Sequence, residues 1–223
     1  DIDLICTASS LHDIGKISIP DEILNKPGRL TAEEFEMIKT HSAIGAKMLQ
    51  ELPPEQQDAP LVKVAFEICR WHHERYDGRG YPDGLKEDEI PISAQVVALA
   101  DVYDALTSER CYKKSFSHDE ALKMILEGQC GTFNPLLLQC LQETADTLAF
   151  ELKNAPHSEL EAKRIQDIGE KLQQYELFSS EQQINLLSQE QQKFQFLSET
   201  SSNIIFSYNV LPAIVNLNAY GAQ

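Results

Sequence analysis

Six side chains in the first half of the sequence are of the types that bind metal ions, and four of them form two adjacent pairs. Imidazole nitrogens and carboxylate oxygens in one site suit iron, manganese or zinc, and two adjacent pairs suit more than one ion. The sequence therefore predicts a centre for several metal ions. Its predicted ligands are His12, Asp13, His41, His72, His73 and Asp101.

Sequence context separates these residues from ordinary buried side chains. A single buried histidine is more often hydrogen-bonded in a core than bound to a metal, so His41 alone would not identify a site. Asp101, however, lies within the apolar run 94–106, where a carboxylate is costly unless a metal or a cation pairs with it. Together with two pairs that each end an apolar-phased helix, this favours metal binding.

The remaining histidines and a second aspartate receive other interpretations. His118 and His157 stand at the starts of predicted helices among polar residues, and we expect both to be solvated. Asp104 follows Asp101 by one turn, so it either hydrogen-bonds a ligand histidine or occupies a cap or surface position.

Three cations flank the predicted ligands. Lys16 follows the first pair by one turn, and Arg110 and Lys113 follow the helix that carries Asp101. Fixed cations beside metal ions suit phosphate oxygens, although solvated surface charge is the plainer alternative. Tyr81, in a nearby glycine-rich loop, is equally suited to stacking on a base and to structural packing.

Helical periodicity positions these residues. Capping boxes predict helix starts at Thr31 and Ser117. Ser93 and Asn134 are further predicted N-caps. No strand pattern occurs before residue 150, so the first part of the chain is predicted to be all-α. Helices are expected at 3–14, 31–52, 60–74, 93–109, 117–128 and from 135 onward, with a glycine-rich loop at 77–84.

The rest of the sequence changes character. Residues 151–198 are rich in Gln and Glu, with apolar residues repeating at intervals of three and four. This pattern predicts an amphipathic helical linker through which two chains could form a homodimer. Residues 199–223 contain two short strand-like runs separated by Pro212, which predict the start of an α/β domain. The expected domains are therefore 1–150, 151–198 and 199–223.

Composition disfavours several classes of protein. The 223 residues carry a net charge of -16, and binding to a nucleic-acid polymer depends on Lys and Arg contacts. No apolar run of about 18 residues predicts a membrane span, and the start does not resemble a signal peptide. Five cysteines without a CxxC pair indicate reduced thiols in the cytoplasm. Both ends look like cuts within a longer protein.

Several motifs resemble those of one enzyme family. Residues 11–16 read Leu-His-Asp-Ile-Gly-Lys, which is similar to the signature of the HD-domain metal phosphohydrolases. Residues 72–82 resemble the hallmark of the HD-GYP subgroup. Residues 100–107 and 110–113 match in the same order, so the resemblance covers about residues 4–142. Residues from about 194 onward faintly resemble the start of a PAS-type sensory domain, which implies fused sensory domains.

The resemblance implies an HD-domain helical bundle and a cytoplasmic phosphodiesterase. Such enzymes hydrolyse cyclic dinucleotides, chiefly cyclic di-GMP, to pGpG or GMP, using two or three divalent ions, usually iron or manganese. The six residues named above would be the metal ligands, and Asp13 and Lys16 would act in catalysis. Substrate would be bound by Lys16, Arg110 and Lys113 and by the loop residues Gly80, Tyr81 and Pro82.

The sequence departs from the family pattern at a few positions. Gln95 stands where Arg is expected, Cys111 where Pro is usual, and Asn134 where Asp is common. None of these is a predicted ligand, and we interpret them as drift. The family also takes a His, and in trinuclear members a Glu, from a helix before the first pair. The sequence starts after that helix, so fewer or more weakly bound metals are expected.

Two other functions remain open at this point. One is an HD-type hydrolase that acts on a different cyclic nucleotide. The other is a non-catalytic signalling module that binds a cyclic dinucleotide or a partner protein. The intact GYP loop argues against a cyclic mononucleotide substrate, and the complete set of core ligands argues against a decayed enzyme.

Overall fold

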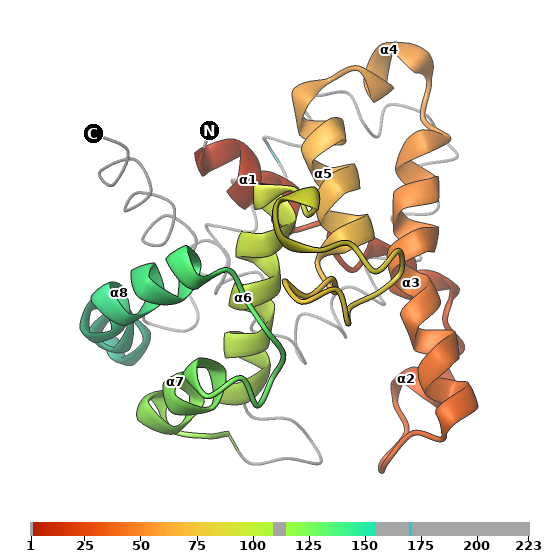
Figure 1. Cartoon of the computed structure of the whole chain (residues 1–223). Helices are drawn as coiled ribbons and strands as arrows, with labels where there is room; N and C mark the ends of the chain where they lie inside the picture. Colours follow the sequence, from red (N-terminus) through yellow and green to blue (C-terminus); the bar gives the residue numbers. More distant parts are fainter. Residues whose placement is uncertain (1, 109–114, 155–169, 171–223) are drawn as a thin grey trace.

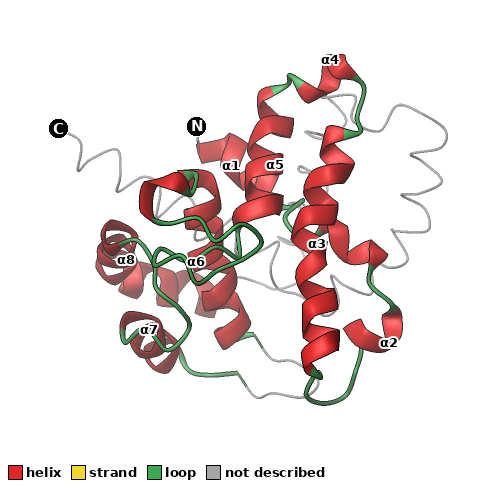
Figure 2. Cartoon of the chain, turned by 45° about the vertical axis from the view of Figure 1, so that its right-hand side comes forward, coloured by secondary structure: helices red, strands yellow, loops and turns green. Residues whose placement is uncertain are grey.

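The computed structural model describes residues 2–108, 115–154 and 170. Every regular element in these ranges is a helix, as Figure 2 shows, so the predicted all-α class is confirmed there. Outside the described residues lie Arg110, Cys111, Lys113, His157, nearly all of the predicted linker and the predicted α/β start at 199–223.

The helices follow one another with short connections, except for a long loop between α5 and α6 (Figure 1). The elements are α1 (Ile2–Ser9), the 3-10 helix η1 (Ile14–Ser18), α2 (Asp21–Leu24), α3 (Ala32–Gln50), α4 (Pro54–Gln57), α5 (Pro60–Trp71), the 3-10 helix η2 (Glu87–Glu89), α6 (Ile92–Thr107), α7 (His118–Leu126) and α8 (Pro135–Asn154).

Three helix starts follow the sequence prediction. Thr31 and Glu34 form a capping box that begins α3, and Ser117 and Glu120 form another that begins α7. The Asn134 side chain accepts a hydrogen bond at 2.9 Å from the backbone N–H two residues later, at the start of α8. These caps satisfy N–H groups that have no partner within the helix.

The predicted helix 3–14 is wrong in its second half. α1 ends at Ser9, and residues 10–13 form a turn before η1 begins. The reason is a close approach of two backbones: a Cβ on Gly15 would lie 2.0 Å from the carbonyl oxygen of His41. Because η1 lies directly against α3, the chain has to turn after α1, and only glycine fits at the contact.

The predicted N-cap of α6 is also wrong. The helix begins at Ile92 with Pro91 as N-cap, so Ser93 lies inside its first turn. The Ser93 hydroxyl instead donates a hydrogen bond to the Glu67 carboxylate on α5 at 2.6 Å. A tertiary contact has therefore taken the side chain that local capping would have used.

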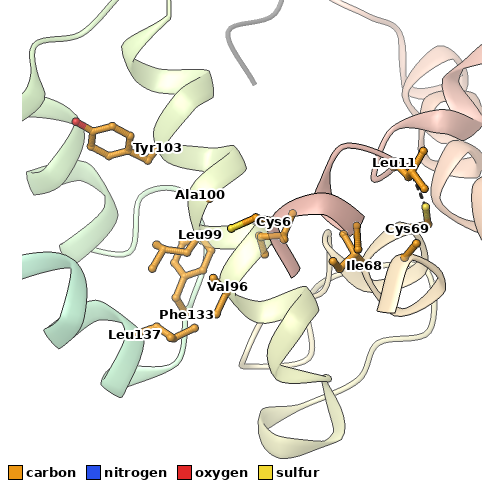
Figure 3. Close-up of a cluster of buried hydrophobic side chains, with 14 of the residues drawn as sticks. Cys6, Leu11, Ile68, Cys69, Val96, Leu99, Ala100, Tyr103, Phe133 and Leu137 are labelled. Atoms are coloured by element: carbon orange, nitrogen blue, oxygen red, sulfur yellow. Dashed lines mark hydrogen bonds between the residues drawn. The ribbon is translucent and has the colours of Figure 1, made fainter. Parts of the chain in front are cut away.

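The helices contact one another in a small number of pairs, and α5 takes part in several of them. α3 packs against α5 and η1, α1 packs on α5, α5 on α6, α6 on α7 and α7 on α8, an arrangement visible in Figure 1. Apolar side chains from most of these helices form one core cluster (Figure 3). Fully buried members include Ile68, Leu99, Leu137 and Leu141. No helix in the described ranges is both long and apolar enough to span a membrane.

Candidate metal centre

The six predicted ligands come from four separate segments of the bundle. His12 and Asp13 lie in the turn after α1, and His41 lies on α3. His72 and His73 follow the end of α5, and Asp101 lies on α6. The packing of α3 on α5 and η1 therefore brings residues that are far apart in the sequence to one place.

Four of the six side chains form a compact group. Asp13, His41, His72 and His73 each offer a ligand atom, and these atoms all lie within 4.8 Å of one another. Asp13 Oδ1 lies 3.3 Å from His41 Nε2 and 3.8 Å from His72 Nε2. Ligand atoms bound about 2 Å from one ion have spacings of this order.

Hydrogen bonds orient three of the imidazole rings. The Nδ1 atoms of His12, His41 and His72 lie 2.8, 2.6 and 2.8 Å from backbone carbonyl oxygens three or four residues earlier. A carbonyl only accepts, so each Nδ1 donates, and each Nε2 is directed toward the centre. The Nε2 atoms of His41 and His72 lie 3.3 Å apart, a contact that is favourable only with a proton or cation between them.

A second group of donors lies on the other side of Asp13. His12 Nε2 lies 3.2 Å from Asp13 Oδ2 and 4.0 Å from Asp101 Oδ1. The two oxygens of Asp13 thus face two different sets of ligand atoms, as a carboxylate shared by two ions would. Lys16 Nζ lies 2.5 Å from Asp13 Oδ2 and supplies the positive charge nearest to that oxygen.

Burial and charge fix the protonation of these groups. Burial holds the pKa values of His72 and His73 well below the usual range, so both rings are neutral and able to bind metal. Burial would also lower the pKa of His12, but the adjacent Asp13 carboxylate outweighs it and raises that pKa to about 9. Burial would raise the pKa of Asp13, but His12 and Lys16 hold it well below its usual value.

The centre contains polar atoms that the protein alone does not satisfy. His12 Nε2 and Asp13 Oδ1 are buried and have no hydrogen-bond partner, although charged groups lie near both. Buried polar atoms without partners are costly. The donor set and its orientation therefore fit divalent metal ions, which would satisfy these atoms.

The glycine-rich loop is held against the end of α5. A Cβ on Gly80 would lie 2.3 Å from the Cα of Glu74, so the loop touches that backbone closely. The Tyr81 ring stacks on His73, with centroids 4.7 Å apart. The Tyr81–Pro82 peptide bond is cis. The three predicted loop residues thus lie directly beside one of the predicted ligands.

Sequence reasoning missed the residues that anchor this loop. Glu74 is buried, and its Oε1 accepts hydrogen bonds from the backbone N–H groups of Asp83 and Gly84 at 2.7 and 3.0 Å. Arg70 and Trp71 donate to the Asp83 carboxylate. The position of Glu74 immediately after the second histidine pair was the one available signal.

The prediction that His118 is solvated is wrong. Its side chain is half-buried, and its Nδ1 lies 2.6 Å from the hydroxyl oxygen of Tyr103, which is fully buried. A buried tyrosine hydroxyl needs a partner, and that requirement draws in the histidine. Asp104 is buried rather than on the surface, and it accepts a hydrogen bond from the Ser108 hydroxyl at 2.9 Å.

Two of the departures from the family pattern, Gln95 and Asn134, contact each other. The Asn134 amide donates a hydrogen bond to Gln95 Oε1 at 2.9 Å, across 39 positions of sequence. The Gln95 amide donates in turn to the Ile90 carbonyl at 2.7 Å. Two departures from the family pattern therefore meet as one amide pair.

Comparison with known proteins agrees with the fold and the centre. The family model described as HD domain matches residues 3–135, more than half of the chain. The chain therefore belongs to the HD-domain family.

Three relatives illustrate the similarity. A Vibrio cholerae protein named probable cyclic di-GMP phosphodiesterase is 49% identical over 139 residues, which are 61% of this chain and 31% of that protein. A Thermotoga maritima cyclic di-GMP phosphodiesterase is 52% identical over 118 residues, 53% of this chain and 31% of that protein. A second Vibrio cholerae protein, 3'3'-cGAMP-specific phosphodiesterase 2, is 43% identical over 145 residues, 65% of this chain and 27% of that protein. The chain spans about a third of the length of these relatives.

Proposed function

We propose that this chain is a metal-dependent phosphodiesterase that hydrolyses cyclic di-GMP to pGpG, to GMP or to both. The observation that carries the proposal is the position of Asp13, whose two oxygens face two sets of ligand atoms from different helices. Relatives named as cyclic di-GMP phosphodiesterases support the choice of substrate.

The six side chains would hold the divalent ions in two groups. Asp13, His41, His72 and His73 would form one group, and His12 and Asp101 would form the other beside Asp13. We infer iron or manganese, because mixed imidazole and carboxylate ligands suit both. Divalent ions at such a centre make water a nucleophile near neutral pH and offset charge on phosphate oxygens.

The remaining roles belong to Asp13, to three nearby cations and to the GYP loop. Asp13 accepts a hydrogen bond from the attacking nucleophile and so fixes its direction. Lys16, held beside Asp13, neutralises charge on a non-bridging phosphate oxygen as it develops. Arg110 and Lys113 bind substrate phosphates, and Gly80, Tyr81 and Pro82 shape the edge of the site.

A second substrate is favoured by one specific observation. A relative named as specific for 3'3'-cGAMP is 43% identical to this chain, which lies within the 42–52% identity of the relatives named for cyclic di-GMP. The two phosphodiester linkages of 3'3'-cyclic GMP-AMP are of the same kind as those of cyclic di-GMP. Rates on the two cyclic dinucleotides, compared at equal concentration, decide which is preferred.

The direct test is turnover. The protein is incubated without oxygen with cyclic di-GMP and either manganese or ferrous iron, and products are separated by chromatography. Release of pGpG or GMP that is lost in His12→Ala supports the proposal. A metal-loaded protein that binds cyclic di-GMP and releases no product would instead be a binding module.

We place the protein in the cytoplasm, where cyclic dinucleotides act as messengers. Cys69 is a buried thiol whose Sγ donates a hydrogen bond to the Leu11 carbonyl at 2.9 Å, which fits a reducing compartment. In this proposal residues 1–150 form the hydrolase domain, 151–198 a linker that pairs two chains, and 199–223 the start of a sensory domain.

A further inference from the structure

The Tyr81 ring, which lies next to the predicted ligand His73, is packed between two other side chains. Tyr81 stacks on His73, and Lys39 Nζ lies over the Tyr81 ring, 5.6 Å from its centroid. A nucleobase stacked on Tyr81 would have to displace a predicted metal ligand or this cation. Tyr81 is therefore packing rather than a platform for a base.

A second ring continues the same row outward. Lys39 Nζ also lies 5.6 Å from the centroid of Phe35, its neighbour one turn earlier on α3. The row thus runs from His73 through Tyr81 and Lys39 to Phe35. The long loop between α5 and α6 reaches α3 at this point, as Figure 1 shows.

Phe35 is more exposed to solvent than the Tyr81 ring. Its side chain is 48% exposed, although a phenylalanine ring gains from burial. Lys39, in contrast, is partly covered and is paired with Glu36 at 2.6 Å. The outer end of the row is thus an oriented aromatic surface that is open to solvent.

The spacing along α3 suits the far end of a nucleotide. Phe35 precedes His41 by six residues, which is about 9 Å along the helix axis at 1.5 Å per residue. A base whose phosphate lies at the metal centre is held away from it by its ribose. Bases bind to proteins by stacking on exposed aromatic rings, and a neighbouring cation adds to that attraction.

We propose that Phe35, held in place by Lys39, is the platform on which one base of the cyclic dinucleotide stacks. This inference rests on the proposed function, because it assumes that a phosphate of the same molecule binds at the His–Asp centre. It assigns a substrate-binding role to a residue of α3 that carries no metal-binding or charged group. Met37 offers a matched control, since it is 43% exposed but lies on another side of the same helix.

The test compares two substrates and four proteins. Initial rates are measured for wild type, Phe35→Ala, Phe35→Tyr and Met37→Ala on cyclic di-GMP and on bis(4-nitrophenyl) phosphate. The second substrate carries its rings directly on the phosphate and lacks the ribose that would bring them to Phe35. Phe35→Ala should raise KM for cyclic di-GMP roughly tenfold and leave kcat unchanged, as expected for loss of one stacked base.

The other variants separate this effect from damage to the fold. Phe35→Tyr and Met37→Ala should keep the wild-type KM, and all four proteins should hydrolyse bis(4-nitrophenyl) phosphate equally. An unchanged KM in Phe35→Ala, or an equal loss on both substrates, overturns the platform. Absence of all hydrolysis in wild type overturns the proposed function instead. In that case calorimetric titration with cyclic di-GMP tests the role of Phe35 without turnover. Equal affinity in Phe35→Ala and wild type rejects that role.

Discussion

At the scale of single residues, Asp13 does the most in the centre. Its neighbours in sequence are typical of a turn, yet its two oxygens face His41 and His72 on one side and His12 and Lys16 on the other. A negative charge among three imidazoles would favour the binding of cations at this place. Removing the charge while keeping the shape isolates that contribution.

We expect Asp13→Asn to lose bound metal and turnover together. Changes to residues that only orient metal ligands already weaken metal binding by about 10–100-fold, so loss of a shared ligand should cost at least about 100-fold. Metal content after desalting, measured by mass spectrometry, and hydrolysis of cyclic di-GMP check this. Asp146→Asn, on the exposed side of α8, should change neither quantity. Wild-type metal content and turnover in Asp13→Asn would contradict the site assignment.

A second residue-scale feature is the amide pair Gln95–Asn134. Gln95 is buried and makes hydrogen bonds at both ends of its amide, to Asn134 and to the Ile90 carbonyl. The family resemblance leads us to expect Arg and Asp at these two positions, so two neutral amides stand where two opposite charges are expected. A single change back would leave a buried charge beside an unsuitable partner.

We therefore expect non-additive stabilities in a double-mutant cycle. Gln95→Arg and Asn134→Asp should each lower the free energy of unfolding by about 1–3 kcal/mol, since each disturbs a buried hydrogen bond. The double variant should recover most of that loss. Urea unfolding of the four proteins gives the coupling, and Gln139→Arg on the exposed face of α8 is the control for the substitution itself. Additive losses would mean that the two departures are unrelated.

At the scale of elements, the loop between α5 and α6 has the least regular structure and lies closest to the site. Apart from the short 3-10 helix η2 it is irregular, and its shape depends on Glu74, on the stacking of Tyr81 and on close backbone contact at Gly80. The contact at Gly80 is with backbone atoms of Glu74 and Arg75, which have little freedom to move.

Gly80→Ala should consequently be much more harmful than the same change elsewhere. The added Cβ would lie 2.3 Å from the Glu74 Cα and would push the loop away from His73, lowering the free energy of unfolding by about 1–3 kcal/mol. At Gly28 nothing lies within 4 Å of an added Cβ, so Gly28→Ala should be neutral or slightly stabilising. Thermal unfolding of both variants checks the contrast. Equal melting temperatures would show that the loop is not pressed against this backbone.

At the scale of the whole molecule, the metal centre joins segments that are otherwise separate. Its predicted ligands lie in the turn after α1, on α3, after α5 and on α6. Ions bound there would link four parts of the bundle and would relieve buried atoms that now lack partners. Metal binding and global stability should therefore be coupled.

We expect added manganese to raise the melting temperature. A ligand that binds only the folded state at 100 times its Kd stabilises a protein by about 2.7 kcal/mol. Differential scanning calorimetry with manganese, and then with excess chelator, measures the gain and its reversal. The shift should be absent in Asp13→Asn and present in Asp146→Asn. A wild-type melting temperature that ignores metal would show that no ion links these segments.

The sequence by itself determined the helical class and the capped starts of α3, α7 and α8, and it predicted six metal ligands, four of which lie together. These depend on residue type and on spacings within one helix or turn, which short-range physics controls. The structure alone decided which of those side chains meet, because their segments are distant in the chain. It also showed that Gln95 pairs with Asn134 and His118 with Tyr103. The end of α1 and the row of rings to Phe35 depend equally on backbones and side chains brought together only by packing.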